Sequence, residues 1–158
     1  MQIPQVVIDT NVLLAALRSR RGASHRLLRL IGSGKFEINV SVAPVLEYEA
    51  AAKGMLHEIP LNVRDIEDII DYICSVANRS SVYYLWRPFS RDPKDDMLVE
   101  LGVAAGCEAI ITFNKRDFRG LDSYAIDNII ASFRVKRFAW FNLSGNRYLD
   151  FIRDDGLY

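Results

Sequence analysis

Residues 5–12 read QVVIDTNV and carry the clearest structural signal in the chain. Three consecutive β-branched residues predict a buried strand that ends at Asp9, and the apolar residues after Asn11 follow a helical spacing. In open α/β proteins, functional side chains lie just beyond the carboxyl ends of such strands. Asp9 is therefore the first candidate for a functional residue.

The alternation of strand and helix continues along the chain. The apolar spacing and the helix-cap and turn residues predict helices over 11–17, 24–31, from about 44, 62–78 and 95–105. Ser24 is the expected cap of the second helix. Strands are predicted over 36–40, 81–85, 109–112 and 135–141, with a short last helix over 148–153. This pattern predicts an α/β fold whose mostly parallel sheet is covered by helices on both faces.

Length and composition fit one soluble globular domain over residues 1–158. Half of the residues are apolar and 25% are charged, which is the usage of a folded, non-membrane protein. The chain starts without a signal-peptide pattern and contains no stretch of membrane-spanning length. Cys74 and Cys107 lack metal-ligand spacing, and two cysteines make no disulfide framework. We therefore expect a cytoplasmic protein.

Three further acids fall near equivalent ends of predicted strands. Glu47 lies in the helix after the second strand, Asp95 opens the helix that leads into strand 109–112, and Asp117 follows that strand. Parallel strands bring such positions to one edge of a sheet. Clustered carboxylates need raised pKa values or a bound cation, and ligands that are all oxygen suit Mg²⁺ or Mn²⁺. Such ions activate water for phosphodiester hydrolysis.

Each acid also has a purely structural interpretation. Residues 9–11 could form only a helix cap, as could Asp95, while Glu47 could be a solvated surface acid and Asp117 the end of a loop. The agreement of all four positions, rather than any one of them, favours a functional site.

Four segments together closely resemble the PIN-domain family, above all the toxin components of toxin–antitoxin modules. They read VVIDTNV at 6–12, VLEY at 45–48, RDPKDDMLVEL at 91–101 and IITFNKRDF at 110–118. The resemblance covers about residues 5–121 in the right order, and it leaves 122–158 as an atypical C-terminal extension of the same domain.

The resemblance implies a three-layer α/β/α sandwich around a mostly parallel sheet of four or five strands. It also implies a Mg²⁺- or Mn²⁺-dependent endoribonuclease similar to the VapC-like toxins. Asp9, Asp95 and Asp117 would bind the metal, and Glu47 would complete the catalytic set. Relatives of this type dimerise and are held inactive by a small antitoxin, so we expect an RNA substrate, a homodimer and an antitoxin partner.

Four further residues would support this site: Thr10, Asn11, Asp96 and Asn114. The first two would orient Asp9 by hydrogen bonds. Asp96 is ranked behind Asp95 because the family spacing to the following helix fits Asp95 better. Asn114 stands where many relatives carry an acid, so Asp117 would supply the carboxylate on this side of the site and Asn114 would assist it. The amide in place of an acid is compatible with one bound metal rather than two.

RNA contacts are expected from basic residues, although the formal net charge of the chain is zero. No acid occurs over residues 10–36, and four arginines there are candidate RNA contacts: Arg18, Arg20, Arg21 and Arg26. A solvated helix face is the alternative. The basic and aromatic tail 134–143 could likewise stack on RNA, but a strand that completes the core or a dimer contact is favoured.

Rival functions fit less well. A dehalogenase-like phosphohydrolase needs a second Asp where Asn11 stands, and a phosphate-accepting receiver domain needs an acidic pair and a Lys that are not evident. A PIN scaffold that only binds RNA or protein would be marked by loss of the acids, and all four are present.

Overall fold

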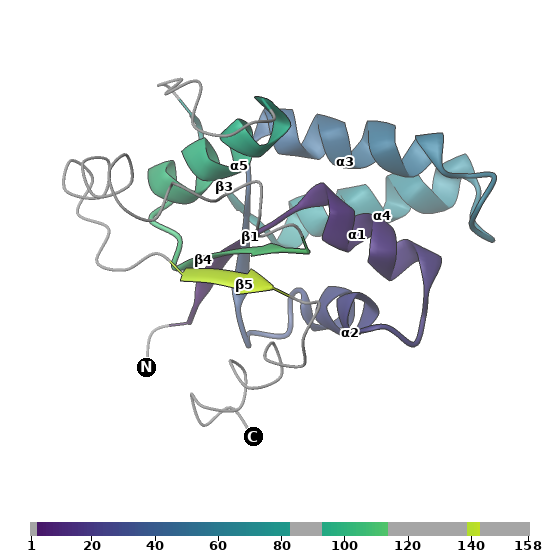
Figure 1. Cartoon of the computed structure of the whole chain (residues 1–158), viewed down its shortest axis with the longest axis horizontal. Coiled ribbons are helices and arrows are strands. Elements are labelled where there is room, and N and C mark those ends of the chain that lie inside the picture. The colour runs from purple at the N-terminus through teal and green to yellow at the C-terminus, as the bar shows by residue number, and fades with distance from the viewer. Residues whose placement is uncertain (1–2, 83–92, 114–138, 143–158) are drawn as a thin grey trace.

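Five parallel strands form the central sheet of the computed structural model, which describes residues 3–82, 93–113 and 139–142. The strands are β1 (Gln5–Ile8), β2 (Glu37–Val40), β3 (Asn78–Arg79), β4 (Ala109–Thr112) and β5 (Ala139–Asn142). Their order is β3-β2-β1-β4-β5, and every neighbouring pair is parallel (Figure 1). The predicted parallel sheet is confirmed.

The direction in which successive strands are added to the sheet reverses between β1 and β4. From β1 the chain proceeds outward through β2 to β3, and it then returns to place β4 and β5 on the other side of β1. Val7 pairs with Ile110 at the centre of this contact. In open α/β sheets such a reversal leaves a crevice at the carboxyl ends of the two strands, where ligands bind.

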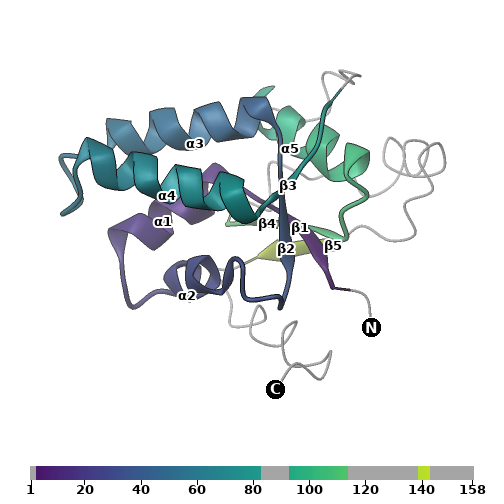
Figure 2. The ribbon, with the colours of Figure 1, turned by 180° about the vertical axis from the view of Figure 1, so that it is seen from behind.

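Helices cover both faces of the sheet. One face carries α1 (Thr10–Arg18), α2 (Ala23–Leu30), α3 (Val42–Gly54) and α4 (Val63–Val76), whereas α5 (Pro93–Ala104) lies on the other (Figure 2). Alternate strand residues supply the two cores: Val6 and Ile8 pack toward the four-helix side, and Val7 packs with Leu98 and Leu101 of α5. This arrangement confirms the three-layer α/β/α sandwich.

Two element boundaries differ from the sequence predictions. Gly22, not Ser24, holds the cap position of α2, and Ser24 is buried inside the first turn. The third strand of the sheet is Asn78–Arg79, which pairs with Asn39 and Val40. Of the predicted strand 81–85, Ser81 and Val82 lie outside any strand, and 83–85 lie outside the described residues.

The remaining elements follow the predictions where the structure describes them. Helix α4 begins after a capping box in which Asn62 and Asp65 each accept from the other's backbone N–H. Strand β5 overlaps the predicted strand 135–141, and the predicted helix 148–153 lies outside the described residues. No helix within the described ranges is both long and apolar enough to cross a membrane.

Candidate active site

Asp9 lies at the point where β1 and β4 diverge. Its backbone N–H donates to the carbonyl of Ile111 (2.9 Å), which continues the β1–β4 pairing to the strand end. Asp9 is the N-cap residue of α1, yet its side chain makes no capping hydrogen bond. Instead, the Thr112 hydroxyl donates to Asp9 Oδ2 at 2.6 Å, and both side chains are buried. A capping role therefore does not explain this carboxylate.

Thr112 also connects Asp9 to Asn11. The Asn11 amide donates to the Thr112 hydroxyl at 3.5 Å, and the backbone N–H of Phe113 donates to Asn11 Oδ1 at 3.4 Å. Thr112 thus hydrogen-bonds Asp9 directly, and Asn11 is connected to Asp9 through Thr112. Thr10 is buried at the start of α1. Sequence reasoning missed Thr112 because the last residue of a buried strand reads as a core position.

Helix α3 is fixed to the end of β1 by Tyr48. The buried Tyr48 hydroxyl donates to the carbonyl of Ile8, the residue before Asp9. Burial raises the pKa of Tyr48, and the negative charges of Asp9 and Glu47 raise it further. Asp9 and Glu47 therefore both lie close enough to the Tyr48 phenol to raise its pKa.

Glu47 is not a solvated surface acid. Its side chain is 18% exposed, and its Oε1 atom lies 3.8 Å from Nζ of Lys94, the residue before Asp95. Because this Lys94 side chain is 69% exposed, the ion pair is screened by solvent and contributes little stability. It does place the start of α5 beside Glu47 on α3.

Helix α5 carries three buried acids. Asp95 and Asp96 lie in its first turn at 9% and 1% exposure, and Glu100 follows one turn later at 4%. Because α5 leads into β4, its first turn lies at the same sheet edge as Asp9. Sequence reasoning ranked Asp95 above Asp96, and the structure buries both. It missed Glu100, although the apolar residues on either side of this acid were a signal of burial.

The donor chemistry of these acids suits a hard cation. Asp9, Glu47 and Asp95 offer only oxygen ligands, as Mg²⁺ and Mn²⁺ require. Within residues 3–82, 93–113 and 139–142, however, no three acidic, His or Cys side chains are grouped so that they could hold a metal ion. Asn114 and Asp117 lie outside the described residues. Convergence of all four acids therefore stays a prediction.

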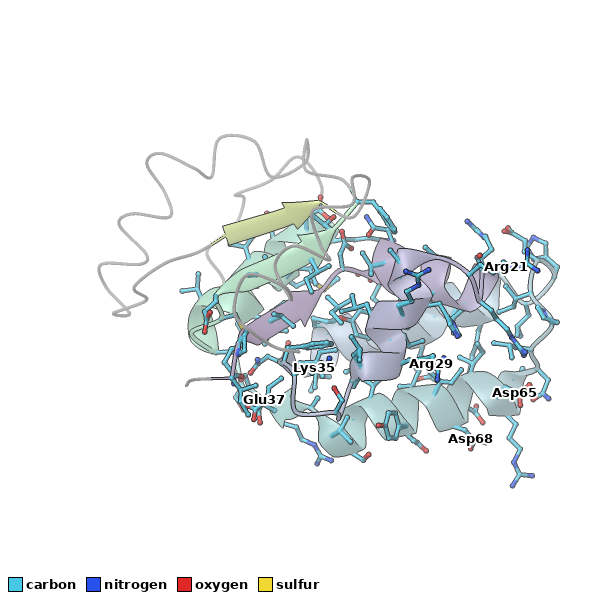
Figure 3. All side chains as sticks on the ribbon, turned by 90° about the horizontal axis from the view of Figure 1, so that it is seen from below. Arg21, Arg29, Lys35, Glu37, Asp65 and Asp68 are labelled. Carbon is cyan, nitrogen blue, oxygen red and sulfur yellow. The ribbon has the colours of Figure 1, made fainter. Side chains whose placement is uncertain are left out.

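The arginine-rich segment begins away from Asp9. Helix α1 carries the chain about 13 Å from Asp9, at about 1.5 Å per residue, before the run begins. Arg18 pairs with Glu58 at 2.6 Å. In Figure 3, Arg21 and Asp65 lie at the end of the molecule away from the strands. These positions support the solvated-face interpretation of the run more than an RNA contact beside Asp9.

The basic and aromatic tail is described only over residues 139–142. These residues form β5, in which Trp140 pairs with Ile110 and Phe141 with Ile111. The strand interpretation of this part of the tail is therefore confirmed, and the remainder of 134–143 lies outside the described residues.

The family model described as PIN domain matches residues 5–116, which is over two thirds of the chain and includes β1 through β4. A comparison with curated proteins finds no match.

Proposed function

Because the chain belongs to the PIN-domain family, whose members are typically nucleases, we propose that it is a Mg²⁺- or Mn²⁺-dependent endoribonuclease. The observation that carries the proposal is the Asp9 carboxylate, buried where β1 and β4 diverge and bound by Thr112 rather than used as a helix cap. Glu47 on α3 and Asp95 on α5 approach the same sheet edge. Carboxylates gathered at such an edge suit phosphodiester hydrolysis.

In this proposal, Asp9, Asp95 and Asp117 would hold the metal, and Glu47 would complete the catalytic set. A bound ion would lower the pKa of a water molecule and neutralise charge on the phosphate. The chain's own contribution is positional. Thr112 fixes one oxygen of Asp9, and Tyr48 ties α3, the helix that carries Glu47, to the end of β1.

The structural support differs among the residues proposed to assist catalysis or bind RNA. Asp96 is buried beside Asp95, which fits a role in holding the first turn of α5 in place. Asn114 would assist Asp117 after β4. Arg18 is engaged by Glu58, and Arg20, Arg21 and Arg26 keep only their sequence-based support as RNA contacts.

Cleavage of RNA tests the proposal directly. Purified full-length chain should cleave single-stranded RNA with Mg²⁺ or Mn²⁺ and should stop when EDTA is added. Asp9→Asn and Asp95→Asn should lose this activity, whereas Asp68→Asn, at an exposed acid on α4, should keep it. Absence of metal-dependent cleavage, or equal cleavage by the two site variants, would contradict the proposal. RNA binding without cleavage would favour the alternative, a PIN scaffold that serves as a binding module.

The biological role that we propose is that of the toxin in a toxin–antitoxin pair, acting in the cytoplasm as a homodimer of one domain over residues 1–158. Its support is the resemblance of the four acidic motifs to that group. Induced expression in a bacterial host should arrest growth, and Asp9→Asn should not. Size-exclusion chromatography with light scattering checks the dimer, and a single cooperative urea transition checks the single domain.

A further inference from the structure

A pocket of about 310 Å³ opens beside the proposed active site. Three segments line it: the start of α3, the residues that follow β3, and the middle of α5. Figure 2 shows these segments close together, with the end of β3 near the starts of α3 and α5. The same two helices carry Glu47 and Asp95, so the pocket and the acids share their walls.

Hydroxyl groups and backbone N–H groups supply hydrogen-bond donors in this pocket. Ser41, Ser80 and Ser81 line it, and a hydroxyl can donate or accept. Ser41 is the N-cap residue of α3, but its side chain makes no capping hydrogen bond. The N–H groups of Val42 and Ala43, in the first turn, have no acceptor within the helix. The rim near α3 and β3 is therefore rich in donors.

The opposite wall supplies an acceptor and apolar surface. Glu100 lines the pocket from α5 although its residue is only 4% exposed, so its carboxylate acts in a poorly solvated environment. Val82 and Met97 add apolar contacts, and a thioether packs well against flat rings. A carboxylate here disfavours a phosphate group, while the neighbouring donors disfavour a purely cationic ligand.

We propose, on the basis of the ribonuclease function proposed above, that this pocket binds one nucleobase of the RNA substrate and selects guanine. The volume is at the small end of ligand pockets, roughly 300–1,000 Å³, which suits a single base. The guanine edge places the N1–H and N2 amino donors next to the O6 acceptor. The Glu100 carboxylate accepts from the two donors, and the seryl hydroxyls or the α3 N–H groups donate to O6. The other three bases lack this donor pair.

The position of the pocket relates the bound base to the cleavage site. Asp9 follows β1, whereas the pocket lies beyond the ends of β2 and β3. Adjacent strands are about 4.8 Å apart, so the pocket is roughly 5–10 Å across the sheet edge from Asp9. The guanine would thus belong to a nucleotide that flanks the scissile phosphate.

Metal-free nucleotide binding tests the pocket alone. Isothermal titration in EDTA with the four ribonucleoside 5′-monophosphates should give GMP an affinity about tenfold higher than the other three. Glu100→Gln should lower GMP affinity about tenfold, and Ser81→Trp, which fills the pocket from its exposed rim, should block all four nucleotides. Glu108→Gln and Ser19→Trp, at exposed positions outside the pocket, are the matched controls and should bind like wild type.

Equal affinity for all four nucleotides would overturn the guanine assignment. Unchanged GMP binding in the pocket variants would overturn the pocket itself. Because Glu100 is buried, its variant is first checked for a wild-type urea transition. If it does not fold, the exposed Ser81 substitution decides on its own.

Cleavage of an RNA pool with randomised single-stranded positions tests the role of the base in the reaction. Wild type should enrich guanine at one position next to the cut, and Glu100→Gln should lose that enrichment. Asp9→Asn should lose cleavage but keep GMP binding. Cleavage without base preference and without GMP binding leaves the nuclease proposal standing and removes this one. Selective GMP binding by a wild-type chain that cleaves no RNA removes the nuclease proposal instead.

Discussion

Replacing Thr112 by Val should weaken the proposed metal site without opening a cavity. Valine keeps the shape of threonine, so the main losses are the 2.6 Å hydrogen bond to Asp9 Oδ2, between two buried side chains, and the 3.5 Å bond that the hydroxyl accepts from Asn11. A hydrogen bond to a charged group contributes about 1.5–3 kcal/mol, and the free energy of unfolding should fall by that order. Supports of metal ligands typically change metal affinity or activity by about 10–100-fold.

The assay for this prediction is RNA cleavage measured across a series of Mg²⁺ concentrations, together with urea unfolding. Thr112→Val should need a higher Mg²⁺ concentration for half-maximal rate, by about 10–100-fold. Thr112→Ser keeps the hydroxyl and is the matched control, with a Mg²⁺ dependence close to wild type. If the two variants depend on Mg²⁺ equally while only the valine variant is less stable, then Thr112 supports the fold and does not position Asp9.

Three further substitutions test the surrounding structure by urea unfolding. Tyr48→Phe removes the hydroxyl bond to the end of β1 and should cost about 0.5–1.5 kcal/mol. Because the native pKa of Tyr48 is raised, wild type should also lose stability as the pH rises above about 10, and the variant should lose less. The pKa of Glu37 is lowered by side-chain hydrogen bonds from Gln5 and then Asn78, so its contribution is present above a pH of about 4.5 and is lost as the pH falls. Glu37→Gln should flatten this acid dependence. The buried Ser24 hydroxyl has no hydrogen-bond partner among the described residues, so Ser24→Ala should leave the free energy of unfolding unchanged or raise it by about 1 kcal/mol.

The buried strands were predictable from sequence because a strand that is covered on both faces consists of a short run of apolar residues. The apolar run at 109–112 coincides with β4, and the run ending at Ile8 coincides with β1 apart from its first residue. Strand β3 has no such signal, since Asn78–Arg79 consists of two exposed polar residues whose extended form is set by pairing with β2. Short edge strands are defined by their partner strand, which no local pattern reveals.

The acids show a different limit of sequence reasoning. Topology alone brings Asp9 and Asp95 to one edge of a parallel sheet, and this part of the candidate site could be predicted. The pattern cannot separate a helix cap from a functional carboxylate, because both use an acid directly after a strand. The separation depends on one side-chain contact, namely whether Asp9 accepts from the first turn of α1 or from Thr112, a residue more than a hundred positions away.

Glu100 shows the same limit of sequence reasoning for an acid that was not predicted to be buried. A glutamate in a helix is by default solvated, yet Glu100 is only 4% exposed. Leu98, Val99 and Leu101 beside it belong to the core that α5 forms with the sheet, whereas Lys94 and Ala104 of the same helix are exposed. Keeping a carboxylate in such a place is costly unless it has a partner. Glu100 meets that condition within the folded chain, so the reason to expect a ligand-binding role for it is its place in the wall of the pocket, not its burial.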